Sequence, residues 1–192
     1  MKHHFERARH VYEDRGFFEL AKTAVEYLPI EVNNAIFHLR HGTGSRVMEE
    51  DCDTLILLDA CRYDMFERQV PFDGRLESRI SLGSTSEEFL RRNLEDNKFH
   101  DTVYVNANAF LPRVGLNQDG TFHAVVDLLD EWNEELDVSL PETVTQAAID
   151  AHEQYPNKRI ILHYMQPHLP FIGDEGLKFR ERLPRRNVWA PF

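Results

Sequence analysis

The sequence has few cysteines, no long apolar run and a deficit of basic residues, and each shortage excludes a class of protein. Two cysteines in 192 residues, Cys52 and Cys61, cannot form the disulfide framework of a small secreted domain. They flank a predicted strand that holds them apart, so we expect a reducing compartment, the cytoplasm. The amino terminus lacks the apolar run of a signal peptide, and no segment approaches the roughly 20 apolar residues that span a bilayer.

Basic side chains are outnumbered by acidic ones. The chain has 22 lysines and arginines against 33 acids, a formal net charge of -11. A general attraction to nucleic acid or anionic lipid is therefore not expected. The hydrophobic fraction of 42% and the charged fraction of 29% are ordinary for a folded protein. The length suits one well-buried core, and the acidic balance suits solubility or the binding of cations.

The first 45 residues form a predicted helical segment. Apolar residues recur at nearly helical spacing from Phe5 to Leu28, interrupted at Gly16, and a further helix is predicted over 30–39. Such helices form a cap on a catalytic layer, a partner surface or a membrane-peripheral face, or they pack on the chain's own sheet. The sequence leaves these alternatives and the oligomeric state open. Residues 41–45 contain two glycines but lack the length and lysine of a P-loop, so they are interpreted as a linker.

Residues 46–192 alternate between strand-like and helix-like patterns. Strands are predicted at 54–58, 76–80, 102–106 and 159–165, helices at 61–69, from 86 and at 141–155, and a strand followed by a helix at 122–132. Strands separated by helices predict an α/β fold with a mainly parallel sheet and helices on both faces. The carboxyl ends of such strands meet at one edge, so loops far apart in sequence converge there.

The first of three notable strand-end loops is Asp59-Ala-Cys-Arg62-Tyr-Asp64, directly after the apolar run at 54–58. A carboxylate in this place is where open α/β sheets carry their chemistry. Either acid also suits the cap of the helix that follows, because it accepts backbone N–H bonds. Taken alone, the loop does not decide between these two roles.

The second loop, residues 81–89, places Ser84, Thr85 and Ser86 ahead of an apolar-periodic helix. A hydroxyl followed by a glutamate is typical of a capping box. The first turn of a helix also offers free N–H groups and a positive dipole end, which favour an anion and an ionised hydroxyl. Both roles can hold together.

The third loop follows the predicted strand at 159–165 and contains Pro167, His168 and Pro170. The two prolines restrict the backbone and fix His168 on a rigid turn. A histidine held in this way binds an anion, donates a proton to a leaving group or ligates a metal. The alternative is a loop histidine with an ordinary hydrogen-bond partner.

Together the three loops resemble the alkaline phosphatase and sulfatase superfamily, in its sulfatase-like branch. The resemblance rests on Asp59-Ala-Cys-Arg62-Tyr-Asp64, on the turn Gly83-Ser-Thr-Ser86 and on Pro167-His-Leu-Pro-Phe171, and it covers roughly residues 53–172. The resemblance implies metal-dependent hydrolysis or transfer of a phosphate or sulfate ester. The substrate would be a small molecule or an ester linked to a glycan or lipid.

The resemblance also implies roles for individual residues. Asp59 would ligate a divalent cation, Mg, Mn, Zn or Ca, which lowers the pKa of the nucleophile and neutralises substrate charge. The nucleophile would be Ser86, Ser84 or Thr85, with Ser86 favoured because it best fits the helix start. His168 would contact the transferred group or its leaving oxygen, and Arg62 together with His168 would bind the substrate.

Three departures from the family pattern shape these expectations. Glu87 and Glu88 follow Ser86 in place of a proline and would repel an anion if they pointed inward. Cys61 lacks the context of the sulfatase cysteine, so no formylglycine-dependent sulfatase is expected. The Asp-His pair that completes the family's metal site is not found, so we expect a carboxy-terminally incomplete domain. The alternative is a catalytically inactive remnant that binds an anion or a protein partner.

Overall fold

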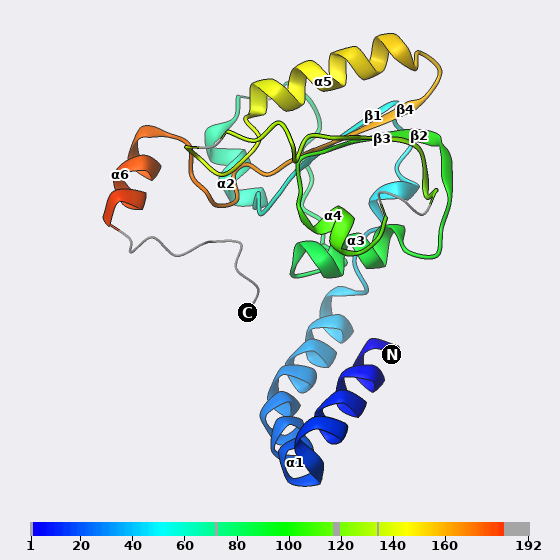
Figure 1. Ribbon diagram of the computed structural model, residues 1–192, viewed down its shortest axis with the longest axis vertical. Coiled ribbons are helices and arrows are strands. Elements are labelled where there is room, and N and C mark those ends of the chain that lie inside the picture. Colours follow the sequence, from blue (N-terminus) through cyan, green and yellow to red (C-terminus); the bar gives the residue numbers. More distant parts are fainter. Residues whose placement is uncertain (1, 72, 117–119, 134, 183–192) are drawn as a thin grey trace. The chain divides into compact units, whose positions relative to one another are not determined.

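The structure is a computed structural model that describes residues 2–71, 73–116, 120–133 and 135–182 (Figure 1). The chain divides into two compact units, Met1–Gly44 and Ser45–Phe192. Within the described parts of the chain, no helix combines the length and the apolar character needed to cross a membrane.

The first unit consists of α1, Lys2–His41, which Gly16 divides into two helices. Gly16 has φ 80° and ψ 178°, a conformation that glycine adopts without steric cost. Figure 1 shows the two helices side by side and running in opposite directions. The expectation of a separate helix over 30–39 is wrong, because the second helix continues through Pro29 to His41. A proline removes one intrahelical hydrogen bond, and here the helix tolerates that loss.

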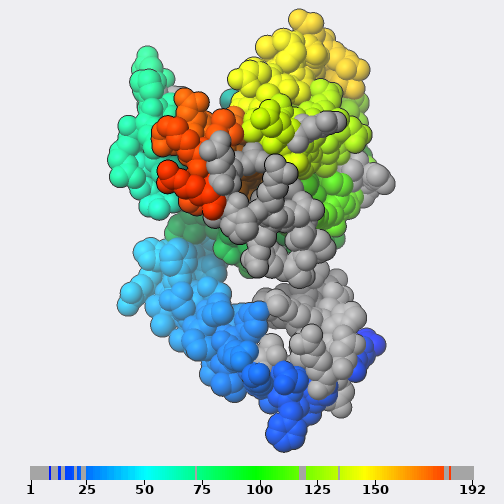
Figure 2. Space-filling view, turned by 60° about the vertical axis from the view of Figure 1, so that its left-hand side comes forward, coloured from blue at the N-terminus to red at the C-terminus, as the bar shows by residue number. Residues whose placement is uncertain are grey.

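The second unit contains a four-stranded parallel sheet with helices on both faces, which confirms the predicted α/β class. The strands are β1 (Thr54–Leu58), β2 (Phe99–Asn106), β3 (Phe122–Asp127) and β4 (Arg159–Tyr164), in the order β1-β4-β2-β3. The helices are η1 (Val47–Glu49), α2 (Tyr63–Gln69), α3 (Ser86–Leu94), α4 (Phe110–Arg113), α5 (Pro141–Gln154) and α6 (Asp174–Arg182). Figures 1 and 2 both show α6 beside α2.

Alternate side chains of the central strands point to opposite faces of the sheet and are buried on both, as the two-residue period of a strand requires. The face under α5 contains Val103, Val105, Ile160 and Leu162, packed with Val144, Ala148 and Ala151 of the helix. The other face contains Tyr104 and Ile161, packed with Leu90 and Leu94 of α3 and Leu111 of α4. The sheet is therefore held from both sides, and α3 is fixed against one of them.

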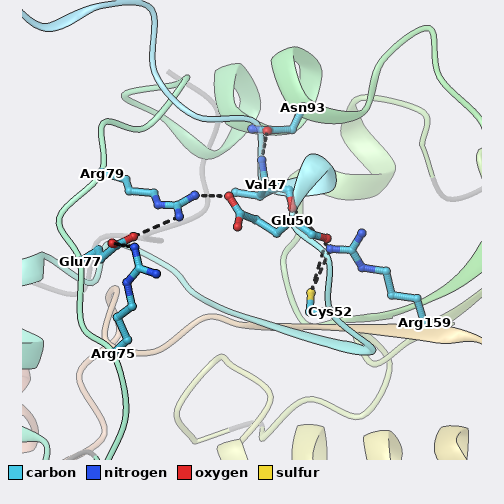
Figure 3. Close-up of polar contacts among 8 residues, drawn as sticks. All are labelled: Val47, Glu50, Cys52, Arg75, Glu77, Arg79, Asn93 and Arg159. Atoms are coloured by element: carbon cyan, nitrogen blue, oxygen red, sulfur yellow. Dashed lines mark hydrogen bonds and ion pairs between the residues drawn. The ribbon is translucent and has the colours of Figure 1, made fainter.

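Polar contacts fix the segment that leads into β1 (Figure 3). Asn93 of α3 accepts a hydrogen bond of 3.0 Å from the backbone N–H of Val47. The guanidinium of Arg159, at the start of β4, donates to the carbonyl of Met48 at 3.1 Å and to Cys52 Sγ at 3.2 Å. These contacts join η1, α3 and the central sheet, so they set where β1 begins.

Three local expectations differ from the structure. Residues 76–80 form no strand, because none of the described strands pairs with them; the next residue, Ser81, makes an isolated bridge to Ser45. Residues 128–132 do not form the expected helix; the Asp127 carboxylate accepts the backbone N–H of Leu129 and stabilises a turn there. The helices α4 and α6 were not predicted.

Candidate functional site at the carboxyl edge of the sheet

Asp59 follows β1 directly and is held there by the backbone. Its N–H donates to the carbonyl of Tyr164 in β4 at 3.1 Å, which continues the parallel pairing by one residue. Cys61 N–H then donates to the carbonyl of Leu58 at 3.2 Å, and Ala60 within this turn has a φ of 59°. A non-glycine residue in the left-handed region is unfavourable and is seen most often at functional turns. The turn directs the chain away from the sheet immediately after the Asp59 carboxylate.

The amino terminus of α3 is a capped helix start. Thr85 Oγ1 accepts a hydrogen bond from the N–H of Glu88 at 3.2 Å. The Glu88 carboxylate accepts the hydroxyl and the N–H of Ser84, at 3.0 and 2.8 Å. Gly83 is required at this point, because a Cβ there would overlap the backbone of Glu88 and Phe89. Thr85 and Ser84 are therefore used to form the helix start.

Ser86, the first residue of α3, is the hydroxyl that reaches the end of β1. Its Oγ donates to Asp59 Oδ2 at 2.9 Å, and both side chains are half-buried. Of the three hydroxyls, Ser86 is the one that contacts Asp59, and its role as nucleophile stays a prediction. Glu87 and Glu88 do not oppose it, because they pair along the helix with Arg91 and Arg92.

Asn108, two residues beyond β2, completes the surroundings of the Asp59 carboxylate. Its Nδ2 donates to Asp59 Oδ2 at 2.8 Å, and its Oδ1 accepts the N–H of Phe110 at 2.9 Å. The second contact fixes which end of the amide faces Asp59. Asn108 is fully buried, so its amide is a rigid donor to one oxygen of the carboxylate.

His163, in β4, extends this network into the core. Its Nε2 lies 3.3 Å from Asn108 Nδ2 and its Nδ1 lies 2.7 Å from the Tyr104 hydroxyl. Because the amide nitrogen of Asn108 is a donor, Nε2 must accept, and the proton of the neutral ring sits on Nδ1. Burial lowers the pKa of His163 from 6.5 to about 4, although the Asp59 carboxylate acts in the opposite direction. Burial, with a smaller contribution from Asp59, also raises the pKa of Tyr104.

His168 lies next to Asp59 through its backbone. Its N–H donates to the carbonyls of Asp59, at 3.1 Å, and Met165, at 2.9 Å. Its ring Nδ1 lies 2.8 Å from the carbonyl of Leu169 and therefore carries a proton. Nε2 then accepts in the neutral ring and donates only when the ring is protonated. The structure thus brings the side chains of Asp59 and Ser86 together and places the backbone of His168 beside Asp59.

Arg62 is not brought to this network. Its guanidinium makes two hydrogen bonds of 2.9 Å with the carboxylate of Asp64, which also accepts one from Arg68. The second acid of the opening motif is therefore bound to two arginines. Burial raises the pKa of the neighbouring Cys61 thiol.

Few side chains at this edge of the sheet are available as metal ligands. Among the described residues, no three histidine, cysteine, aspartate or glutamate side chains lie together as a group for an ion. Oδ2 of Asp59 accepts two hydrogen bonds, and no described residue donates one to Oδ1. Mg²⁺ is commonly held by one or two carboxylates, with water and substrate phosphate completing its shell. The described residues therefore offer one carboxylate oxygen at this edge of the sheet, and they do not form a preformed metal centre.

Sequence reasoning missed Asn108, His163 and Tyr104. Asn108 follows a predicted strand closely, so the convergence of strand ends already pointed to it. His163 and Tyr104 lie inside strands whose apolar composition indicates only burial, and no local pattern marks their hydrogen bond.

Comparison of the chain with protein-family models, with curated proteins and with solved structures found no match.

Proposed function

We propose that the second unit hydrolyses or transfers a phosphate or sulfate ester, with Ser86 as the nucleophile. The observation that carries this proposal is the 2.9 Å hydrogen bond from Ser86 Oγ to Asp59 Oδ2 at the carboxyl edge of a parallel sheet. A nucleophile and a carboxylate within hydrogen-bond reach, beside a helix amino terminus, form an arrangement typical of group transfer to a serine. The esters proposed are small molecules or glycan- and lipid-linked compounds.

The proposed reaction proceeds in two steps. Ser86 Oγ attacks phosphorus or sulfur and transfers its proton to Asp59 Oδ2, while the bond to the leaving oxygen breaks. Protonated His168 donates from Nε2 to that oxygen, because Nδ1 is bound to Leu169. Water or another alcohol then attacks phosphorus or sulfur and gives its proton to the now neutral Nε2 of His168, while the bond to Ser86 Oγ breaks and Asp59 Oδ2 returns its proton to that oxygen. Asn108 positions the base for the first step, because its N–H bond holds Asp59 Oδ2 beside Ser86 Oγ.

A divalent cation, Mg, Mn, Zn or Ca, is part of the proposal, and Asp59 would hold it through Oδ1. When bound with the substrate, it would neutralise charge on the phosphoryl or sulfuryl oxygens. Both thiols, Cys52 and Cys61, are free, which suits the reducing cytoplasm proposed as the protein's location.

The scarcity of metal-ligating side chains around Asp59 favours a second candidate function. If Asp59 holds no cation, the unit is a catalytically inactive protein that binds an anion at the start of α3 or a protein partner. Arg62 would contribute to anion binding only after leaving Asp64, since its guanidinium is paired there.

The test is hydrolysis of an aryl phosphate, an aryl phosphodiester and an aryl sulfate by the purified chain with each of the four cations. We expect turnover of at least one ester, and a loss of at least about 1,000-fold in Ser86→Ala, as for other nucleophiles. Ser84→Ala is the matched control, because Ser84 bonds Glu88, and it should keep full activity. Turnover of none of the three esters contradicts the enzymatic proposal.

Calorimetric titration of each cation separates the two candidates. With inorganic phosphate present, we expect binding heat for wild type and its loss in Asp59→Asn. Equal, weak heats from both proteins favour the inactive anion-binding protein.

A further inference from the structure

An exposed apolar stripe with the seven-residue repeat of a coiled coil runs along the second helix of α1. Its members are Phe18, Ala21, Val25, Leu28, Val32, Ala35 and Leu39. The spacing alternates strictly between three and four residues over three full heptads. This 3.5-residue period is typical of a seam that packs against another helix. Phe17, Ile30, Ile36 and Phe37 of the same helix are also exposed and lie outside the seam.

The large side chains of the stripe lie in solvent. Phe18 is 89% exposed, Val25 70% and Leu39 88%, and Leu28 and Val32 are at least half exposed. Leaving this many large apolar side chains in water is unfavourable, and such stripes mark interaction surfaces. The helix that bears them is about 33 Å long over the repeat, long enough for a continuous interface.

Charge distinguishes between a protein partner and a membrane surface. Residues 1–44 contain six basic and six acidic side chains, so the whole formal charge of -11 falls on the rest of the chain. An anionic membrane attracts basic helices, and this chain offers no basic excess. Both signs flank the stripe, as Glu26, Glu31 and Arg40 show, so a second copy meets no net repulsion from the helices themselves.

We propose that this apolar stripe pairs with the same stripe of a second copy, so that the chain dimerises through its amino-terminal helices. Each hairpin contributes one seam-bearing helix and one outer helix, and the dimer interface is then a four-helix arrangement. Ten large apolar side chains, five from each copy, leave water together. Pro29 is the residue after Leu28 of the stripe, so it lies beside the seam and takes no part in it.

The test is the mass of the full chain in solution, measured by light scattering and by sedimentation equilibrium over a range of concentrations. We expect a dimer for wild type. Phe18→Glu and Leu39→Glu should each weaken dimerisation by at least about tenfold, because each places a charge inside the apolar seam. Both side chains are almost fully exposed in one chain, so neither change removes a contact that folds the monomer.

Asn33→Glu is the matched control, since it adds the same charge at an exposed position of the same helix outside the stripe. It should dimerise like wild type, and circular dichroism should show equal helix content in all four proteins. A monomeric wild type overturns the proposal, and so does a dimer that both stripe variants leave unchanged. Sedimentation of monomeric wild type with lipid vesicles would assign the stripe to a membrane surface.

Discussion

Acidification should destabilise the second unit through one residue, His163. In the folded state, burial lowers the pKa of His163 from 6.5 to about 4. In the unfolded chain the side chain is exposed to water, and its pKa returns to 6.5. Between these two values the unfolded state binds more protons than the folded state, so stability falls as the pH falls. The contribution is fully present above pH 6.5 and is lost progressively down to about pH 4.

The expected magnitude follows from the two pKa values. Each unit of pKa corresponds to about 1.4 kcal/mol, so the full loss is about 3 kcal/mol. Between about pH 7.5 and about pH 4.5, linkage gives a loss of about 2 to 3 kcal/mol from this residue alone. Such a loss is a large part of the stability of an ordinary domain.

The assay is urea unfolding of wild type and His163→Gln at these two pH values. Glutamine can accept the hydrogen bond from Asn108 but does not titrate, so the variant is less stable at neutral pH and should lose less stability on acidification. Carboxylates titrate in both proteins, and comparing the two losses removes their effect. His123→Gln, at an exposed histidine, should behave as wild type. Equal losses in wild type and His163→Gln would refute the buried neutral histidine.

Two further changes test the structure around the site. Thr85→Ala should lower the free energy of unfolding by about 1 kcal/mol, because the N-cap bond to Glu88 is lost, and Thr85→Ser should restore most of it in urea unfolding. Asn108→Ala should cost about 1–3 kcal/mol, because it removes the donor shared by Asp59 and His163. Asn157→Ala, at an exposed asparagine, is the control and should change stability by less than about 0.5 kcal/mol; equal costs for the two asparagines would contradict the network.

The sequence predicts most of the sheet because hydrophobic periodicity records burial directly. The strand at 159–165 and the helix at 141–155 lie within a residue of β4 and α5. Residues 76–80 show the limit of that reasoning, since an alternating pattern becomes a strand only where a neighbour pairs with it. Pairing depends on the whole chain and leaves no local trace.

The part of the candidate site that lies at the carboxyl ends of the strands could be predicted from the sequence. Asp59 and His168 follow strands, and Ser86 begins the helix that packs on them, so their approach follows from parallel topology. The choice of Ser86 over Thr85 as nucleophile was favoured by its place in the helix and stays a prediction; Thr85 itself is the N-cap of α3. Which ring nitrogen of His163 carries the proton depends on which end of the Asn108 amide faces the ring. The spacing of residues along the sequence does not reveal that orientation.

The central claim is that Ser86 becomes the site of covalent transfer, and peptide mass spectrometry tests it most directly. The chain would be incubated with an aryl phosphate and each divalent cation, quenched in acid and digested. We expect one phosphoryl group on the peptide that contains Ser86, with fragmentation placing it on that residue and with no label in Ser86→Ala. A label on Ser84 or Thr85, or turnover of substrate that persists in Ser86→Ala, would contradict the account.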